Sequence, residues 1–155
     1  MSPQTLLAVT SGEPGRFVVT GDHYQLVTDG TLQTGGPGIA PGARELLVVS
    51  LLTCALNAVR GGGYGDPAEH RDRTVRIDAR LDDSDDPVLF GRLDLAIDVP
   101  GERESAVHEL VVGWLDQCRI HEILREHFAI SVAYAGRPPV STTTLSGGAD
   151  RPPRR

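Results

Sequence analysis

The sequence contains no lysine, since all 15 of its basic residues are arginine. Together with 18 glycines and 11 prolines, this usage indicates a GC-rich genome and does not point to a function. Acidic residues outnumber basic ones by 21 to 15, which gives a net charge of −6. A surface of that charge offers no broad electrostatic reason to expect a nucleic-acid partner.

Cysteine is scarce as well. The chain has two, Cys54 and Cys118, which are too few for a disulfide framework. The N-terminus lacks the basic flank and long apolar run of a secretory signal, so we expect a cytoplasmic protein. Each thiol could then be catalytic, redox-active or an inert core residue.

The longest apolar stretch, residues 43–59, is predicted to form a helix. It contains no glycine or proline, and the glycines that begin at Gly61 predict its end. Its apolar residues lie all round the helix, which predicts a wholly buried one. The polar residues Arg44, Glu45 and Ser50 argue against a membrane span.

Strands are expected on both sides of this helix. The six predicted ranges are 5–9, 16–20 and 23–28 before it, and 75–81, 93–99 and 129–134 after it. In 75–81 and 93–99 apolar residues alternate with Arg and Asp, so we expect the charged rows to pair across the two strands. The glycine-rich run 35–42 is interpreted as a connector, although its glycines would also let the backbone approach a ligand.

Two more helices, 102–117 and 120–127, are predicted between the last two strands. The first has one apolar face that ends at Cys118. The order βββ-α-ββ-αα-β describes an α+β domain over residues 1–135. Residues 136–155 are rich in Pro, Gly, Ser and Thr, and are predicted to be a disordered tail.

A reactive thiol needs a cation or a helix N-terminus to stabilise its thiolate. Cys118 is followed by Arg119 and His121, and is expected at the start of a short helix, whereas Cys54 has no basic neighbour in the sequence. His121 could be an acid/base partner of a thiolate or a structural residue. Cys118 and His121 supply only two metal ligands, so no metal is expected.

Two segments around the cysteines resemble a known family. Glu45-Leu-Leu-Val-Val-Ser-Leu-Leu-Thr-Cys54 is similar to the "ELLLASLxxC" segment of the OsmC/Ohr thiol peroxidases (osmotically inducible protein C and organic hydroperoxide resistance proteins). The run from Gly101 to His121 resembles the second helix of that family and its "CPVH" cysteine. The separation of the two cysteines, 64 positions (118 minus 54), is typical of the family. The resemblance covers residues 5–134.

This resemblance implies an OsmC/Ohr-like α+β fold with a buried central helix, assembled as an intertwined homodimer with active sites near the interface. It further implies an antioxidant, stress-response peroxidase. Cys54 would attack the hydroperoxide of a hydrophobic molecule as a thiolate and become a sulfenic acid, and Cys118 would condense with it to a disulfide. A dithiol reductant, often a lipoyl group, would reopen that disulfide without a metal or an organic cofactor.

The residues that assist the thiolate in the family are altered here. Glu13 aligns with the family's thiolate-stabilising arginine, and a carboxylate there opposes thiolate formation. Arg16, three residues on, is the candidate substitute. The residue ten positions before Cys54 is Arg44, where organic hydroperoxide resistance proteins have a glutamate, and Glu45 is nine before it.

Glu45 lies roughly 13 Å along the helix axis from Cys54, so it could reach that thiol only across a dimer. Arg119 replaces the proline that usually follows the second cysteine. The predicted site therefore comprises Cys54, Cys118, Glu45 and Arg16. Two functional classes stay open: a peroxidase, and a non-peroxidatic relative that binds or processes a hydrophobic small molecule in the interface pocket. A third possibility is a structural dimer with inert thiols.

Overall fold

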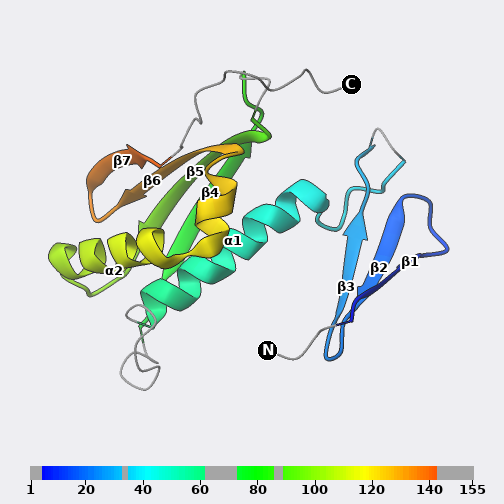
Figure 1. Ribbon diagram of the computed structural model, residues 1–155, viewed down its shortest axis with the longest axis horizontal. Helices are drawn as coiled ribbons and strands as arrows, with labels where there is room; N and C mark the ends of the chain where they lie inside the picture. The colour runs from blue at the N-terminus through cyan, green and yellow to red at the C-terminus, as the bar shows by residue number, and fades with distance from the viewer. Residues whose placement is uncertain (1–4, 33–34, 62–72, 86–88, 143–155) are drawn as a thin grey trace. The chain divides into compact units, whose positions relative to one another are not determined.

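The computed structural model describes residues 5–32, 35–61, 73–85 and 89–142 (Figure 1). Its elements are β1 (Leu7–Thr10), β2 (Arg16–Thr20), β3 (Gln25–Asp29), α1 (Ala43–Arg60), β4 (Arg76–Asp82), β5 (Gly91–Asp98), α2 (Glu104–Gln117), α3 (Arg119–Leu124), β6 (Phe128–Tyr134) and β7 (Arg137–Ser141). The α+β class is confirmed, and the predicted order of elements is correct as far as β6.

The chain divides into two compact units, Met1–Ser50 and Leu51–Arg155. The boundary falls inside α1, so Ala43–Ser50 belongs to the first unit and Leu51–Arg60 to the second. Among the described residues, no helix combines the length and hydropathy that crossing a membrane requires.

The first unit contains an antiparallel sheet of order β1-β2-β3. Its register places Val18 between Val9 and Val27. No apolar side chain in these three strands is buried, and Leu7 and Val27 are 61% and 42% exposed. A small sheet needs a covered apolar face for stability, and the three strands of this unit do not provide one among themselves.

The second unit contains a sheet of order β4-β5-β6-β7. Strands β5 and β6 are parallel and are joined through α2 and α3, as a parallel connection requires. Every second residue of β5 and β6 is buried, and α2 contributes the apolar face predicted from its spacing. The largest fully buried side chains are Trp114, Phe128, Leu51, Leu93, Ile130, Val59, Val111 and Val132.

Helix α1 is not wholly buried, which corrects the prediction. One stripe is covered, comprising Leu51, Ala55, Ala58 and Val59. Val49 and Leu56, on the opposite side, are 48% and 38% exposed, and Leu47, one turn before Leu51 on the same side, is 42% exposed. The apolar residues of the helix therefore extend beyond the stripe that is covered.

Arg73 closes the C-terminal end of α1. Its Nη1 donates to the carbonyl oxygens of Val59 and Arg60 at 3.2 and 3.4 Å, and its Nε pairs with Glu102 at 2.9 Å. A cation is favourable at this end of a helix because the last carbonyl groups lack helical partners. Residues 62–72, which follow α1 in the sequence, lie outside the described residues.

The charged face of the second sheet has the predicted register but not the predicted pairs. Arg80 lies opposite Asp94, as expected. The ion pairs, however, join residues two apart on one strand: Arg76–Asp78 at 3.0 Å, Arg80–Asp82 at 2.7 Å and Arg92–Asp94 at 3.1 Å. Successive outward side chains of a strand are also neighbours on its face, so a long arginine reaches either one.

Strand β7 corrects the prediction of a tail beginning at residue 136. Pro138 and Pro139 disfavoured a strand there, but β7 is an edge strand, where a missing N–H need not break the ladder. The turn into it uses Ala135 and Gly136, both with positive φ (49° and 70°). Residues 143–155 of the predicted tail lie outside the described part of the chain.

Candidate functional site

The four predicted site residues are divided between the two units. Arg16 and Glu45 belong to the first unit, and Cys54 and Cys118 to the second. Both cysteines are present as thiols.

Cys54 lies on α1 at the border between its covered and exposed sides. Leu51 and Ala58, one turn before and after it on the helix, are 0% and 2% exposed. On its other flank, Ser50 and Asn57 are exposed, and Cys54 itself is half-buried. The thiol is thus packed on one side and partly accessible on the other.

Cys118 is 2% exposed and forms the junction between α2 and α3. Its backbone N–H closes α2 by donating to the Trp114 carbonyl oxygen at 2.9 Å. Its Sγ accepts a hydrogen bond from the backbone N–H of His121 at 3.4 Å, so the thiol caps the first turn of α3. The predicted position at the start of a short helix is confirmed.

The ring of His121 is engaged at both nitrogens. Nδ1 lies 3.2 Å from the Leu115 carbonyl oxygen, which can only accept, so Nδ1 carries the proton. Nε2 is then free to accept from the Thr142 hydroxyl at 2.9 Å. Burial lowers the pKa of His121 against the opposing effect of the Leu115 hydrogen bond, which favours the neutral ring. The contact with Cys118 is made by the backbone, so the geometry favours a structural role for the ring.

Arg16 begins β2, and its guanidinium contacts two carboxylates. Nε and Nη2 donate to the two oxygens of Asp29 at 2.9 and 3.2 Å, and Nη1 donates to Glu13 Oε2 at 2.5 Å. The hydrogen bonds to Asp29 raise the pKa of Arg16. Glu13, which aligned with the family's arginine, is thus an ion-pair partner of the substitute.

Asp29 was missed by the sequence analysis. Its side chain is only 1% exposed, and Oδ2 also accepts from the backbone N–H groups of Ile39 and Ala40 at 2.9 and 2.8 Å. The Arg16 hydrogen bonds, assisted by these two, lower its pKa from 3.8 to about 2 against the cost of desolvation. The predicted strand ended at Thr28, one residue too early to include Asp29. In the structure β3 includes Asp29, which lies directly opposite Arg16 of β2.

The glycine-rich run before α1 is therefore more than a connector. Asp29 fixes Ile39 and Ala40, and the backbone at Gly36 packs against the end of the β2–β3 pair. A Cβ on Gly36 would overlap the carbonyl oxygen of Gly30. Glycine is required at this position because the backbone comes close to another part of the chain, and no ligand is needed to explain it.

Glu45 is exposed in the first turn of α1, where a carboxylate interacts favourably with the positive end of the helix dipole. Its Oε2 would lie 2.8 Å from a Cβ placed on Gly42, so the side chain turns back towards the helix start. The ion pairs of Arg16 are made with Glu13 and Asp29 instead.

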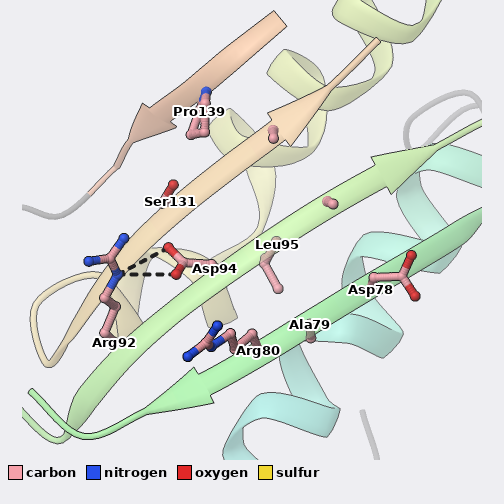
Figure 2. A pocket seen from close by; sticks show the side chains of 10 residues that line it. Asp78, Ala79, Arg80, Arg92, Asp94, Leu95, Ser131 and Pro139 are labelled. Carbon is pink, nitrogen blue, oxygen red and sulfur yellow. Dashed lines mark hydrogen bonds and ion pairs between the residues drawn. The ribbon is translucent and has the colours of Figure 1, made fainter. Parts of the chain in front are cut away.

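A hollow of about 450 Å³ lies on the charged face of the second sheet, where Figure 2 shows Arg92 beside Asp94, with Ser131 and Pro139 on the neighbouring strands. It is lined by Asp78, Ala79, Arg80, Arg92, Asp94, Leu95, Ala96, Ser131, Ala133 and Pro139. Neither cysteine contributes to it.

A second hollow, of about 420 Å³, lies along the second half of α1, and Cys54 is not among its lining residues. It is lined by Thr53, Leu56, Asn57, Arg60, Arg73, Thr74 and Val75. Thr53 precedes Cys54 and Asn57 follows it by about one turn. Within the described ranges, no three His, Cys, Asp or Glu side chains gather in a way that could hold a metal ion.

Neither a family model nor a curated protein matches the sequence. Solved structures do match its fold. An OsmC-like protein from Mycoplasma pneumoniae is 18% identical with a TM-score of 0.61, over 86% of this chain and 96% of its own. An organic hydroperoxide resistance protein OsmC from Legionella pneumophila is 17% identical with a TM-score of 0.56, over 87% and 98%.

The organic hydroperoxide resistance protein OhrB of Bacillus subtilis is 12% identical with a TM-score of 0.57, over 84% of this chain and 98% of its own. These matches extend over nearly the whole length of the similar chains. The predicted OsmC/Ohr-like fold is confirmed, and the resemblance first seen in two short segments applies to the whole arrangement of elements.

Proposed function

We propose that this chain is a thiol-dependent peroxidase that reduces organic hydroperoxides, with Cys54 as the attacking thiol and Cys118 as the resolving one. The observation that carries the proposal is the setting of Cys54 on an OsmC/Ohr fold, half-buried at the edge of the exposed side of α1. Solved proteins of this fold include ones described as organic hydroperoxide resistance proteins. The cellular role would be antioxidant, in the cytoplasm.

The proposed reaction has three balanced steps. The Cys54 thiolate attacks the outer oxygen of ROOH, the O–O bond breaks, and the departing alkoxide takes a proton to give ROH and a Cys54 sulfenic acid. The Cys118 thiol then displaces water from the sulfenic acid and forms a disulfide. Finally, a dithiol reductant, of the lipoyl type in our proposal, restores both thiols and is itself oxidised to a disulfide.

We further propose that the working form is a homodimer. None of the apolar residues of β1–β3 is buried, and Leu47, Val49 and Leu56 of α1 are exposed. A second copy would cover these surfaces and let Arg16 and Glu45 act on a Cys54 thiolate. A hydrophobic hydroperoxide suits an apolar dimer interface of this kind.

The test compares wild type with Cys54→Ser and Cys118→Ser, using cumene hydroperoxide and dihydrolipoamide. Wild type should consume peroxide, Cys54→Ser should remain at background, and Cys118→Ser should accumulate a sulfenic acid that dimedone traps at Cys54. Peroxide-treated wild type should yield a Cys54–Cys118 disulfide by mass spectrometry. Wild-type consumption at background would overturn the peroxidase function, and turnover without that disulfide would overturn the role of Cys118.

One observation favours a second function, that of a non-peroxidatic protein binding a hydrophobic small molecule. Arg16, the cation proposed to assist the thiolate, is already paired with Asp29 and Glu13. In that case wild type would be inactive towards cumene hydroperoxide and Cys54 would react slowly with iodoacetamide. An apolar fluorescent probe would still bind, and would bind equally to Cys54→Ser.

A further inference from the structure

Three segments of the second unit meet at the ring of His121. Nδ1 donates to the Leu115 carbonyl oxygen in the last turn of α2 at 3.2 Å, and Nε2 accepts from the Thr142 hydroxyl at 2.9 Å. Thr142 directly follows β7 and is itself fixed, because its backbone N–H donates to the Ile130 carbonyl oxygen of β6 at 2.9 Å. The His121 side chain thus joins α2, α3 and the end of the β6–β7 pair.

The backbone of the same residue contacts the Cys118 thiol. The His121 N–H donates to Cys118 Sγ at 3.4 Å, and both residues are 2% exposed. Sulfur is a weak acceptor, so this bond depends on how well the N–H is held in place. Since both residues are buried, water is poorly placed to replace the bond if the N–H moves away.

Helix α3 is too short to hold that N–H by itself. It spans six residues, Arg119–Leu124, and its first turn includes a bond from the Glu122 N–H to the Cys118 carbonyl oxygen at 3.0 Å. Isolated helices of this length are unstable in water, so the position of α3 depends on tertiary contacts. The ring of His121 makes such a contact through each nitrogen, and the Thr142 hydroxyl is the partner that comes from outside the two helices.

We propose that Thr142 is a positioning residue for the Cys118 thiol, because by holding the His121 ring it keeps the His121 N–H directed at Sγ. A hydrogen bond donated to sulfur favours the thiolate, which is the nucleophilic form. Thr142 takes no part in bond making or breaking. In the proposed function, on which the catalytic meaning of this inference rests, the affected step is the displacement of water from the Cys54 sulfenic acid by Cys118.

The experiment measures the alkylation rate of Cys118 by iodoacetamide from pH 7 to pH 10 in a Cys54→Ser background, so that one thiol reports. Thr142→Val keeps the shape of the side chain and removes its hydroxyl. It should slow alkylation at pH 7 by about two- to tenfold, the range that the net loss of one hydrogen bond allows, and move the rate profile to higher pH. Thr142→Ser, which keeps the hydroxyl, should retain the wild-type profile. Ser141→Ala, at the exposed neighbouring position, is the matched control and should change neither the rate nor the profile.

The charged groups near the thiol are the same in all of these proteins. Burial, together with the charge of Arg125, lowers the pKa of His121 from 6.5, so the ring stays neutral throughout this pH range. Arg119, exposed beside Cys118, is also unchanged. A shift of the rate profile between the variants therefore reports on Cys118.

Hydrogen exchange of the His121 backbone amide, followed by NMR, tests the hydrogen bond without using the chemistry of the thiol. Thr142→Val should speed this exchange, and Thr142→Ser should not. An unchanged exchange rate would overturn the proposal, because Thr142 would then not hold the N–H. Alkylation that accelerates equally at every pH would also overturn it, because Thr142 would then only restrict access to the thiol.

Neither measurement needs peroxide, so the outcome is separate from that of the proposed function. The expected changes in a protein that fails to consume cumene hydroperoxide would uphold the role of Thr142 while rejecting the peroxidase function. Turnover in wild type, with alkylation and exchange both unaffected by Thr142→Val, would do the reverse.

Discussion

Asp29 is a carboxylate held almost completely out of water, with hydrogen-bond donors directed at both of its oxygens. Its charge is compensated by Arg16, and its position ties the glycine-rich run before α1 to the β2–β3 pair. The same residue thus serves the stability of the first unit and the orientation of a proposed catalytic cation. Substitution of Arg16 would leave the buried Asp29 carboxylate without its cation and should therefore lower stability as well.

The lowered pKa of Asp29 predicts acid sensitivity. Since the folded-state pKa of about 2 lies below the ordinary 3.8, its stabilising contribution is complete above about pH 4 and is lost as the pH falls towards 2. Urea unfolding between pH 5 and 2 should show wild type losing stability in this window. Asp29→Asn should be less stable than wild type at pH 5, and its free energy of unfolding should not show this loss between pH 4 and pH 2. If the free energy of unfolding fell equally steeply with pH in the two proteins, Asp29 would not be the group responsible.

His121 predicts a second pH dependence, at higher pH. Burial lowers its pKa from 6.5, so below pH 6.5 the unfolded chain binds a proton that the folded chain resists. The contribution of His121 should therefore make the free energy of unfolding fall as the pH decreases, by at most about 1.4 kcal/mol per pH unit. In urea titrations at a series of pH values, His121→Gln should make the free energy of unfolding less dependent on pH just below pH 6.5. His23→Gln, at an exposed position, should leave it unchanged.

At the scale of elements, the loop before α1 depends on close backbone packing. An added Cβ at Gly36 would overlap the Gly30 carbonyl oxygen, whereas one at Gly12 meets nothing within 4 Å. Gly36→Ala should lower the free energy of unfolding by about 1–3 kcal/mol, and Gly12→Ala should change it by less than about 0.5 kcal/mol. Chemical denaturation of the two variants checks this, and equal values would show that the loop yields to the extra atom.

The elements themselves were largely predictable, because their signals are local. Range 16–20 is β2 as predicted, and α1 extends only one residue beyond the predicted 43–59. The alternation in 93–99 correctly predicted which residues of β5 are buried, because the apolar residues of this strand pack against other apolar side chains. β7 was not predictable in the same way, since a proline-containing strand is stable only once β6 offers an edge to pair with.

At the scale of the whole molecule, the exposed apolar side of α1 predicts self-association. Leu56→Asp should weaken a homodimer and make thermal unfolding more dependent on protein concentration, because a charge would have to be buried in the interface. Sedimentation analysis compares it with Ile123→Asp, which alters an apolar side chain on α3 that is 58% exposed. Wild type sedimenting as a monomer at tens of micromolar would reject the dimer.

The sequence by itself determined the order of the elements up to β6, the resemblance to the OsmC/Ohr fold and the two thiols that any redox chemistry must use. These follow from periodicity, breakers and short motifs, which act over a few residues. Tertiary structure decided which groups meet: Arg16 pairs with Asp29, 13 positions away, and His121 with Thr142, 21 positions away. Such pairs depend on strand register and on burial, which exist only once distant segments have packed, so the local pattern could name Arg16 but not its partner.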